Sequence, residues 1–168
     1  MKSVARIGNV ALHPIFVAIP IICWLIVFAS DIAYMVTLHN TFYVISFVAM
    51  VAGVLGAGLA LGAGVLDYFM AEMSEEAFHV ATFHMLLNLL AVAMYTINIG
   101  YRSTFTTRLE TDPFHWAIAF LLEIGALGLV MLSGLLGRRV AHGPGGVFTN
   151  DPVSKTPAKP QKAKSSRH

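Results

Sequence analysis

Polar side chains able to bind metals or protons occur inside stretches of this chain that are otherwise apolar. Five of them fall toward one end of those stretches: His13, Asp67, His84, Asn88 and His142. Histidines from several helices of one bundle can bind a b-type haem, a metal ion or a quinone headgroup. These residue types therefore favour ligation by imidazole, with Asp67 and Asn88 as hydrogen-bonding partners of the ligands.

A second polar group falls toward the other end of the apolar stretches. Its members are Asp31, Tyr34, His39, Tyr95, Asn98, His115 and, deeper, Glu123. An ionisable group at membrane depth is costly to bury and is a functional hypothesis by default. We expect Glu123 to be protonated or hydrogen-bonded to Tyr95, Asn98 or a histidine. A neutral hydrogen bond between helices would need no further function.

Each residue of the first group also has a structural interpretation. His13 and His142 could lie hydrated at the membrane interface. His84 lies at least one turn inside its stretch and needs a partner, so a structural histidine fits the sequence as well as a ligand does. Asp67 could accept backbone hydrogen bonds or pair with Arg138.

Helical spacing places several of these residues on one face of the third stretch. The residues that step by four, three, four and three positions are His84, Asn88, Ala91, Tyr95 and Asn98. This polar and small stripe predicts a face turned to the interior of a bundle, because lipid exposure of such groups is costly. His79 lies five residues from His84, roughly 140° around the helix, so the two cannot easily bind one metal.

Four long apolar stretches must position these side chains: Pro14–Val36, Phe42–Met70, His79–Ile99 and Phe114–Leu136. Each exceeds the roughly 20 residues that cross a bilayer as a helix. The chain is 57% hydrophobic and only 12% charged, whereas soluble domains carry about 25% charged residues. The sequence predicts an all-α integral membrane four-helix bundle with antiparallel neighbouring spans, in contact with the lipid bilayer.

Charge predicts the domain limits and the orientation. We expect one transmembrane domain over residues 1–147 and a disordered basic tail over residues 148–168. Nine of the eleven Lys and Arg residues fall on the side of the two termini, which predicts an inner-membrane protein with both termini cytoplasmic. The sequence contains no folded basic face, so we expect no nucleic-acid binding.

Small residues recur along the second stretch. Gly53, Ala57, Ala60 and Gly64 follow helical spacing, and a Gly58-x-x-x-Gly62 pair lies beside them. Such faces let helix backbones approach closely in membranes. We expect Leu at Gly58 or Gly64 to push helices apart.

Common catalytic motifs are absent from the sequence. No CxxC, HExxH or phosphate-binding loop occurs, and the single cysteine, Cys23, is more typical of packing than of redox chemistry. Whether the protein is an enzyme is left open.

The polar motifs together resemble the DUF2231 family of small membrane proteins. They are His13-Pro-x-x-x-x-x-Pro20, Gly64-Val-Leu-Asp67-Tyr68, His84-x-x-x-Asn88 and Ser133-Gly-x-x-Gly137 followed by His142-Gly143. Some similar proteins are linked to Rieske-type iron–sulfur domains, so the resemblance implies a redox setting and a haem. Ala18 stands where many members have a histidine, and Arg138–Val147 departs from the acidic stretch typical of relatives.

Three functions are compatible with these features. The leading hypothesis is a redox-associated subunit of a larger membrane complex, or a partner of a Rieske-type protein, with a b-type haem or metal between His84 and either His13 or His142. The second is a non-catalytic accessory subunit. The third is a proton or small-solute path from Asp67 past Tyr95 to Glu123 and Asp31.

Overall fold

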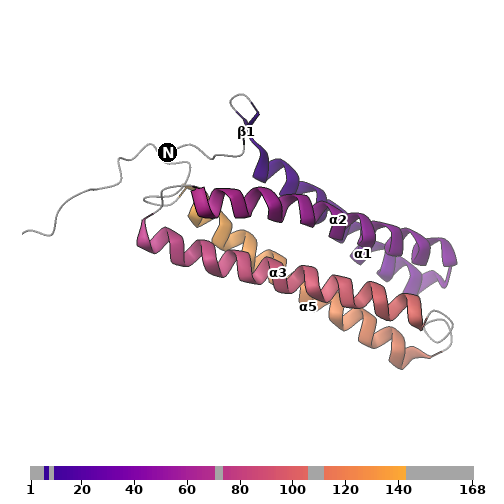
Figure 1. The fold of residues 1–168 in the computed structure, drawn as a ribbon. Helices are drawn as coiled ribbons and strands as arrows, with labels where there is room; N and C mark the ends of the chain where they lie inside the picture. Colours follow the sequence, from indigo (N-terminus) through magenta and orange to yellow (C-terminus); the bar gives the residue numbers. More distant parts are fainter. Residues whose placement is uncertain (1–5, 8–9, 71–73, 106–111, 143–168) are drawn as a thin grey trace, which may run out of the picture.

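The computed structural model describes residues 6–7, 10–70, 74–105 and 112–142, with side chains described between residues 15 and 138. Two short strands pair antiparallel and are followed by four long helices (Figure 1): β1 Arg6–Ile7, β2 Val10–Ala11, α1 Leu12–Thr37, α2 Asn40–Met70, α3 Glu75–Thr104 and α5 Pro113–His142. All four helices are long and apolar enough to span a membrane. The prediction of an all-helical, four-span fold is confirmed.

The bundle consists of two antiparallel hairpins that lie side by side, α1 with α2 and α3 with α5 (Figure 1). We call the end that holds the start of α1 and the end of α5 the terminal end, and the opposite one the distal end. At the distal end α1 passes into α2 through Leu38, which has a φ of 54° and donates its N–H to Tyr34 O at 2.7 Å. This tight turn holds the first hairpin closed.

Side chains cap α3 and α5 as their sequences indicate. The Ser74 hydroxyl accepts the Ala77 N–H at 3.2 Å, and Glu75 and Glu76 occupy the first turn of α3, where the helix dipole favours acids. Asp112 Oδ1 accepts the Phe114 N–H at 2.9 Å at the start of α5. These two side chains mark the starts of α3 and α5.

The distal end of α3 differs from the prediction. The sequence suggested a helix that ended at Ile99 and a polar link from Gly100 onward, but α3 continues to Thr104. The hydroxyls of Ser103 and Thr104 donate back to Gly100 O at 2.9 and 2.8 Å, so polar residues near the end of the helix bond to their own backbone. The extra turn places Arg102 inside the bundle.

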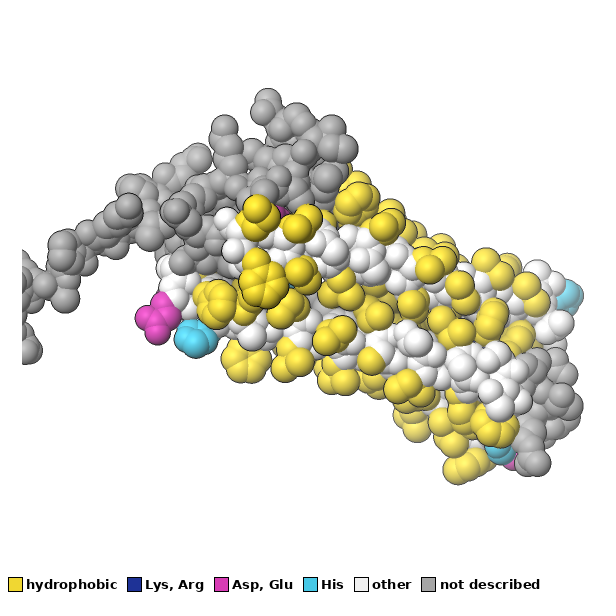
Figure 2. All heavy atoms as spheres, in the orientation of Figure 1, with side chains coloured by type: hydrophobic (Ala, Val, Ile, Leu, Met, Phe, Trp, Pro, Cys, Tyr) yellow, Lys and Arg dark blue, Asp and Glu magenta, His cyan; other side chains and the backbone are white. Residues whose placement is uncertain are grey.

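The outer surface of the four helices is apolar. Large hydrophobic side chains are exposed along each of them, and Figure 2 shows these side chains between the two ends, with Asp, Glu and His visible only near the ends. Such a surface fits the hydrocarbon core of a bilayer. The chain is a multi-pass membrane protein.

Glycines of α2 pack against α1 on one face only. A Cβ at Gly53 would collide with the Trp24 indole, and one at Gly56 would lie 2.8 Å from Ile19 Cγ2. A Cβ at Gly58 or Gly62 would meet nothing within 4 Å. The expectation that Gly58 packs against a neighbouring helix of the bundle is therefore wrong, because this residue lies on the outward side of α2.

Two groups of buried side chains form the core. The central layer joins all four helices and consists of Trp24, Val27, Met50, Ala57, Ala91, Tyr95, Ala126 and Val130. The aromatic layer lies nearer the distal end and consists of Tyr34, Tyr43, Trp116 and Ala119. Five fully buried polar residues, Asp31, Ser46, Asn98, Arg102 and Glu123, belong to the same part of the bundle, whereas the equally buried Ser133 lies nearer the terminal end.

Candidate functional site

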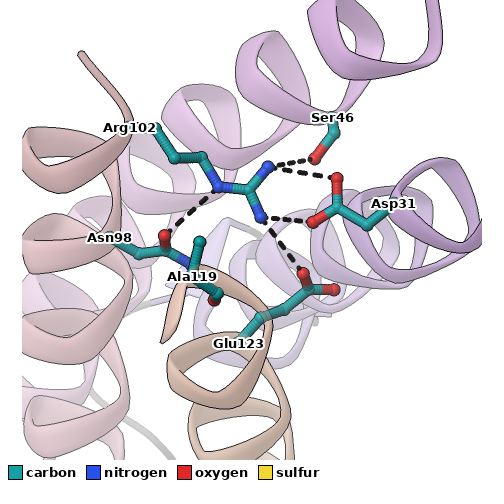
Figure 3. Close-up of polar contacts among 6 residues, drawn as sticks. All are labelled: Asp31, Ser46, Asn98, Arg102, Ala119 and Glu123. Atoms are coloured by element: carbon teal, nitrogen blue, oxygen red, sulfur yellow. Dashed lines mark hydrogen bonds and ion pairs between the residues drawn. The ribbon is translucent and has the colours of Figure 1, made fainter. Parts of the chain in front are cut away.

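Arg102 is fully buried and contacts the other three helices of the bundle (Figure 3). Its partners are Asp31 on α1, Ser46 on α2, Asn98 on α3 itself and Glu123 on α5. Together with Arg102 these residues form what we call the charge cluster. It links the two hairpins at one depth.

The two carboxylates hold Arg102 unequally. Asp31 binds in a bidentate manner: Nη1 donates to Oδ1 at 3.1 Å and Nη2 donates to Oδ2. Glu123 receives only one long contact from Nη2, to Oε2 at 3.5 Å. Its second oxygen, Oε1, has no hydrogen-bond partner among the described residues. Asp31 is therefore the principal counter-ion of Arg102.

Neutral groups fix the remaining donors of the guanidinium. Nη1 also donates to Ser46 Oγ at 3.2 Å, and Nε donates to Asn98 Oδ1 at 3.2 Å. The Asn98 amide in turn donates to Ala119 O at 2.9 Å. Arg102 follows Asn98 by one turn of α3, toward the distal end, whereas Glu123 follows Ala119 by one turn of α5, toward the terminal end. The long side chain of Arg102 spans this difference in depth to reach Glu123.

The charge cluster lies inside the membrane-spanning part of the chain. Asp31, Arg102 and Glu123 each have no exposed surface. Asp31 lies six residues before the end of α1, which corresponds to about 9 Å along the helix. Buried charges of this kind persist only when they are paired and hydrogen-bonded.

Apolar side chains enclose the charge cluster on two sides. Toward the distal end, the guanidinium lies over the Trp116 ring with Cζ 5.1 Å from its centroid, and Tyr34 packs on the same ring with centroids 4.9 Å apart. Toward the terminal end lies the central layer, in which the Trp24 and Tyr95 rings stack at 4.4 Å. Among the described side chains, the charge cluster therefore lies between the aromatic layer and the central layer.

Charge balance defines what this arrangement can do chemically. It contains one cation and two carboxyl groups, and Arg102 Nη2 contacts both of them, Asp31 at Oδ2 and Glu123 at Oε2. Two carboxylates that share a site resist ionising together. With Arg102 neutralised by Asp31, a proton on the second carboxyl group leaves the cluster uncharged. The cluster therefore has the composition of a buried proton-binding site.

A second polar cluster joins α3 to α5 nearer the terminal end. His84 Nδ1 lies 2.7 Å from Ser133 O, and His84 Nε2 lies 3.1 Å from Asn88 Nδ2. Asn88 Nδ2 also contacts Ser133 Oγ at 2.6 Å. We assign the Nδ1–H tautomer to His84, since Ser133 O can only accept and Asn88 Nδ2 can only donate. Both ring nitrogens of His84 then have protein partners.

The predicted site residues are only partly brought together. His84 and Asn88 interact as the stripe indicated, and Ala91, Tyr95 and Asn98 on the same face are buried. The side chain of His79 is exposed, as its position around the helix predicted.

The other members of the first group fall elsewhere. Asp67 is half-buried, three residues before α2 ends. The side chains of His13 and His142 lie outside the described residues.

A haem or metal bound at His84 would have to displace one of the protein partners of its ring nitrogens. Its Nε2 could bond a metal only if the Asn88 amide turned away. The imidazole also lies against the backbone of α5, because a Cβ at Gly137 would be 2.7 Å from His84 Cε1. Among the described residues, no group of three or more His, Cys, Asp or Glu could hold a metal ion. The predicted cofactor site therefore stays a prediction.

Sequence reasoning did not identify Arg102 or Ser46 as site residues. Arg102 was counted as a loop charge, although it continues the polar stripe four residues beyond Asn98. That spacing was a usable signal. Glu123 was expected to bond Tyr95, Asn98 or a histidine, and its partner is instead Arg102. Ser46 carries no comparable signal, since an isolated serine in an apolar helix is common.

Comparisons with known proteins give one match. The sequence matches the family described as "Predicted membrane protein (DUF2231)" over residues 9–148. No curated protein and no solved structure matches the chain.

Proposed function

We propose that this chain, which belongs to the DUF2231 family of predicted membrane proteins, binds and exchanges a proton inside the membrane, at the charge cluster. The observation that carries this proposal is the unequal pairing of Arg102 with two buried carboxyl groups. Asp31 satisfies the arginine, whereas Glu123 makes one contact of 3.5 Å and has an oxygen without a partner among the described residues. Glu123 is thus the group whose proton can leave and return.

The energetics of burial support a proton rather than a permanent charge. An uncompensated charge in a dry protein interior is unfavourable by several kcal/mol, on the order of the penalty for burying one ion. Protonated Glu123 removes that penalty while Arg102 and Asp31 remain paired. Exchange of this proton changes the net charge of the bundle interior by one unit, so we expect it to be coupled to a change in structure.

The contact between the two hairpins suggests where that change occurs. Packing within each hairpin is far more extensive than packing between them. The charge cluster is the point at which Arg102 joins α3 to both helices of the first hairpin. Loss of the Glu123 proton would add repulsion between Asp31 and Glu123 at this junction, and we expect the hairpins to move relative to each other.

Infrared spectroscopy of the purified protein in lipid bilayers tests the proposal directly. The wild type should show a protonated-carboxyl band that changes with pH and disappears in Glu123→Gln. Glu76→Gln, at an exposed position on α3, is the matched control and should leave that band intact. A band that survives Glu123→Gln, or one that does not respond to pH, would contradict the proposal.

The redox hypothesis is a separate proposal with its own test. It needs a second ligand from His13 or His142 and a movement of Asn88 away from His84. An absorption spectrum of protein purified from its native membrane decides it: a Soret band that shifts on reduction supports haem. A spectrum without visible bands, together with elemental analysis that finds no metal, favours the alternative that the protein is a non-catalytic accessory subunit.

We also propose the orientation and location of the bundle. In the sequence, nine of the eleven Lys and Arg residues precede the first span or follow the fourth, and positive residues are retained in the cytoplasm. Both termini are then cytoplasmic in a bacterial-type inner membrane, and the charge cluster lies in the leaflet away from the cytoplasm.

A further inference from the structure

The hydroxyl of Tyr95 is buried without a hydrogen-bond partner in the described part of the chain, and so is Glu123 Oε1. Both side chains have no exposed surface. Buried polar atoms of this kind are normally satisfied by protein groups or by an ordered water. Two such atoms on facing helices therefore call for a common explanation.

Helix register places Tyr95 and Glu123 at the same depth. Asn98 donates to Ala119 O at 2.9 Å, which fixes the antiparallel alignment of α3 and α5. Tyr95 lies about one turn before Asn98, and Glu123 lies one turn after Ala119, so both steps lead toward the terminal end.

The Tyr95 ring is held in place by its neighbours. It stacks on Trp24 with ring centroids 4.4 Å apart and an interplanar angle of 10°. The indole nitrogen of Trp24 lies against Gly53 of α2 and, like the Tyr95 hydroxyl, has no hydrogen-bond partner among the described residues. The stacking limits where the phenol oxygen can lie, and the hydroxyl cannot turn to a distant partner.

We propose that the Tyr95 hydroxyl and Glu123 Oε1 bind one water molecule between them, at the inner edge of the charge cluster. The water donates to one of these oxygens and exchanges hydrogen bonds with the other, which gives a small neutral ligand the two polar partners that it needs. In this position it accepts a hydrogen bond from the protonated Glu123 carboxyl and donates one to the Tyr95 oxygen, so it is the group that first receives the Glu123 proton when that proton exchanges. This role in proton exchange rests on the proposed function, whereas the water site itself does not.

Water-edited solid-state NMR of the protein in lipid bilayers, with 13C-labelled tyrosine, tests the water site. Magnetisation from water should reach the Tyr95 ring at short mixing times, as it should reach the less buried Tyr101 ring. In Glu123→Leu the fast transfer to Tyr95 should be lost and that to Tyr101 unchanged. In Glu123→Gln it should persist, because the amide oxygen still accepts a hydrogen bond. Transfer to Tyr95 as slow as to the buried methyl groups of Val27 would overturn the water site.

A second variant keeps the test decisive if Glu123→Leu does not fold. Tyr95→Phe preserves the ring and its stacking on Trp24, and should abolish fast transfer from water to the 13C-labelled Glu123 carboxyl. Tyr101→Phe is the matched control and should not. Undiminished transfer to Glu123 in Tyr95→Phe would also overturn the proposal.

The same samples separate this inference from the proposed function. If the infrared band of Glu123 fails to respond to pH while water still reaches Tyr95, proton exchange is wrong and the water site stands. If the band responds to pH but water does not reach Tyr95, the water site is wrong and proton exchange stands. With both present, Tyr95→Phe should slow the response of the Glu123 band to a pH jump without abolishing it.

Discussion

Arg102 and Asp31 are 71 positions apart in the sequence, yet two nitrogens of the guanidinium bind both oxygens of this carboxylate in the interior of the bundle. The pair joins α3 of one hairpin to α1 of the other. Because neither side chain is exposed, loss of either partner would leave an uncompensated charge in a dry environment. The stability of the whole bundle is therefore tied to this contact.

Removing the positive charge should destabilise the bundle strongly. We expect Arg102→Gln to lower the free energy of unfolding by about 3–5 kcal/mol, the usual loss when one partner of a buried ion pair is removed. Thermal unfolding in detergent measures the change. Arg138→Gln is the control, because Arg138 is exposed near the end of α5, and its effect should stay within about 0.5 kcal/mol. Equal stability of the two variants would show that Arg102 is not held as described.

The two carboxyl groups should respond differently to neutral replacement. Asp31→Asn leaves Arg102 without its bidentate counter-ion and should lower the free energy of unfolding by about 3–5 kcal/mol. Glu123→Gln resembles the protonated acid in size and charge, so its effect should be less than about 1.5 kcal/mol. Denaturant or thermal unfolding at one fixed pH compares them. A larger loss for Glu123→Gln would mean that Glu123 is the charged partner of Arg102.

Glycine substitutions in α2 should separate the packed face from the lipid-facing one. Gly53→Ala places a methyl group against Trp24 and should destabilise by about 1–3 kcal/mol, as overpacking does. Gly58→Ala meets no neighbour and should be neutral or slightly stabilising, since alanine favours helix over glycine. Unfolding in detergent distinguishes them, and equal losses would contradict the assigned faces.

Alanine substitutions at the two histidines of α3 should have different effects on stability. His84→Ala removes the partner of Asn88 and Ser133 and should lower stability by about 1–3 kcal/mol, the effect of leaving buried polar groups unsatisfied. His79→Ala, at an exposed position, should have little effect. Absorption spectra of the same variants test the cofactor hypothesis: any haem that the wild type carries should be absent from His84→Ala and retained by His79→Ala.

Reporter fusions test the proposed orientation. A reporter at the C-terminus and one inserted between α3 and α5, within residues 106–111, should report opposite sides of the membrane, with the C-terminal reporter in the cytoplasm. Activity of both on the same side would contradict the four-span arrangement.

The sequence by itself determined the four membrane-spanning helices and the membrane class. Four apolar stretches of more than 20 residues leave helices as the only practical way to satisfy the backbone in lipid, and local signals such as Ser74 and Asp112 set where α3 and α5 begin. The polar stripe from His84 to Asn98 also followed from spacing alone, since the period of a helix is fixed.

Only the tertiary structure decided which polar groups meet. Helix period places Asp31 and Glu123 on inward faces, but it does not say that Arg102, near the end of a span, turns inward to lie between them. That choice depends on the antiparallel register of two hairpins, set by contacts such as Asn98 with Ala119 and Trp24 with Gly53. The outward position of Gly58 was likewise undecided, because small residues fill two adjacent faces of α2 and only packing against α1 selects one. Long-range contacts of this kind arise from the packing of the whole bundle, and local spacing carries no information about them.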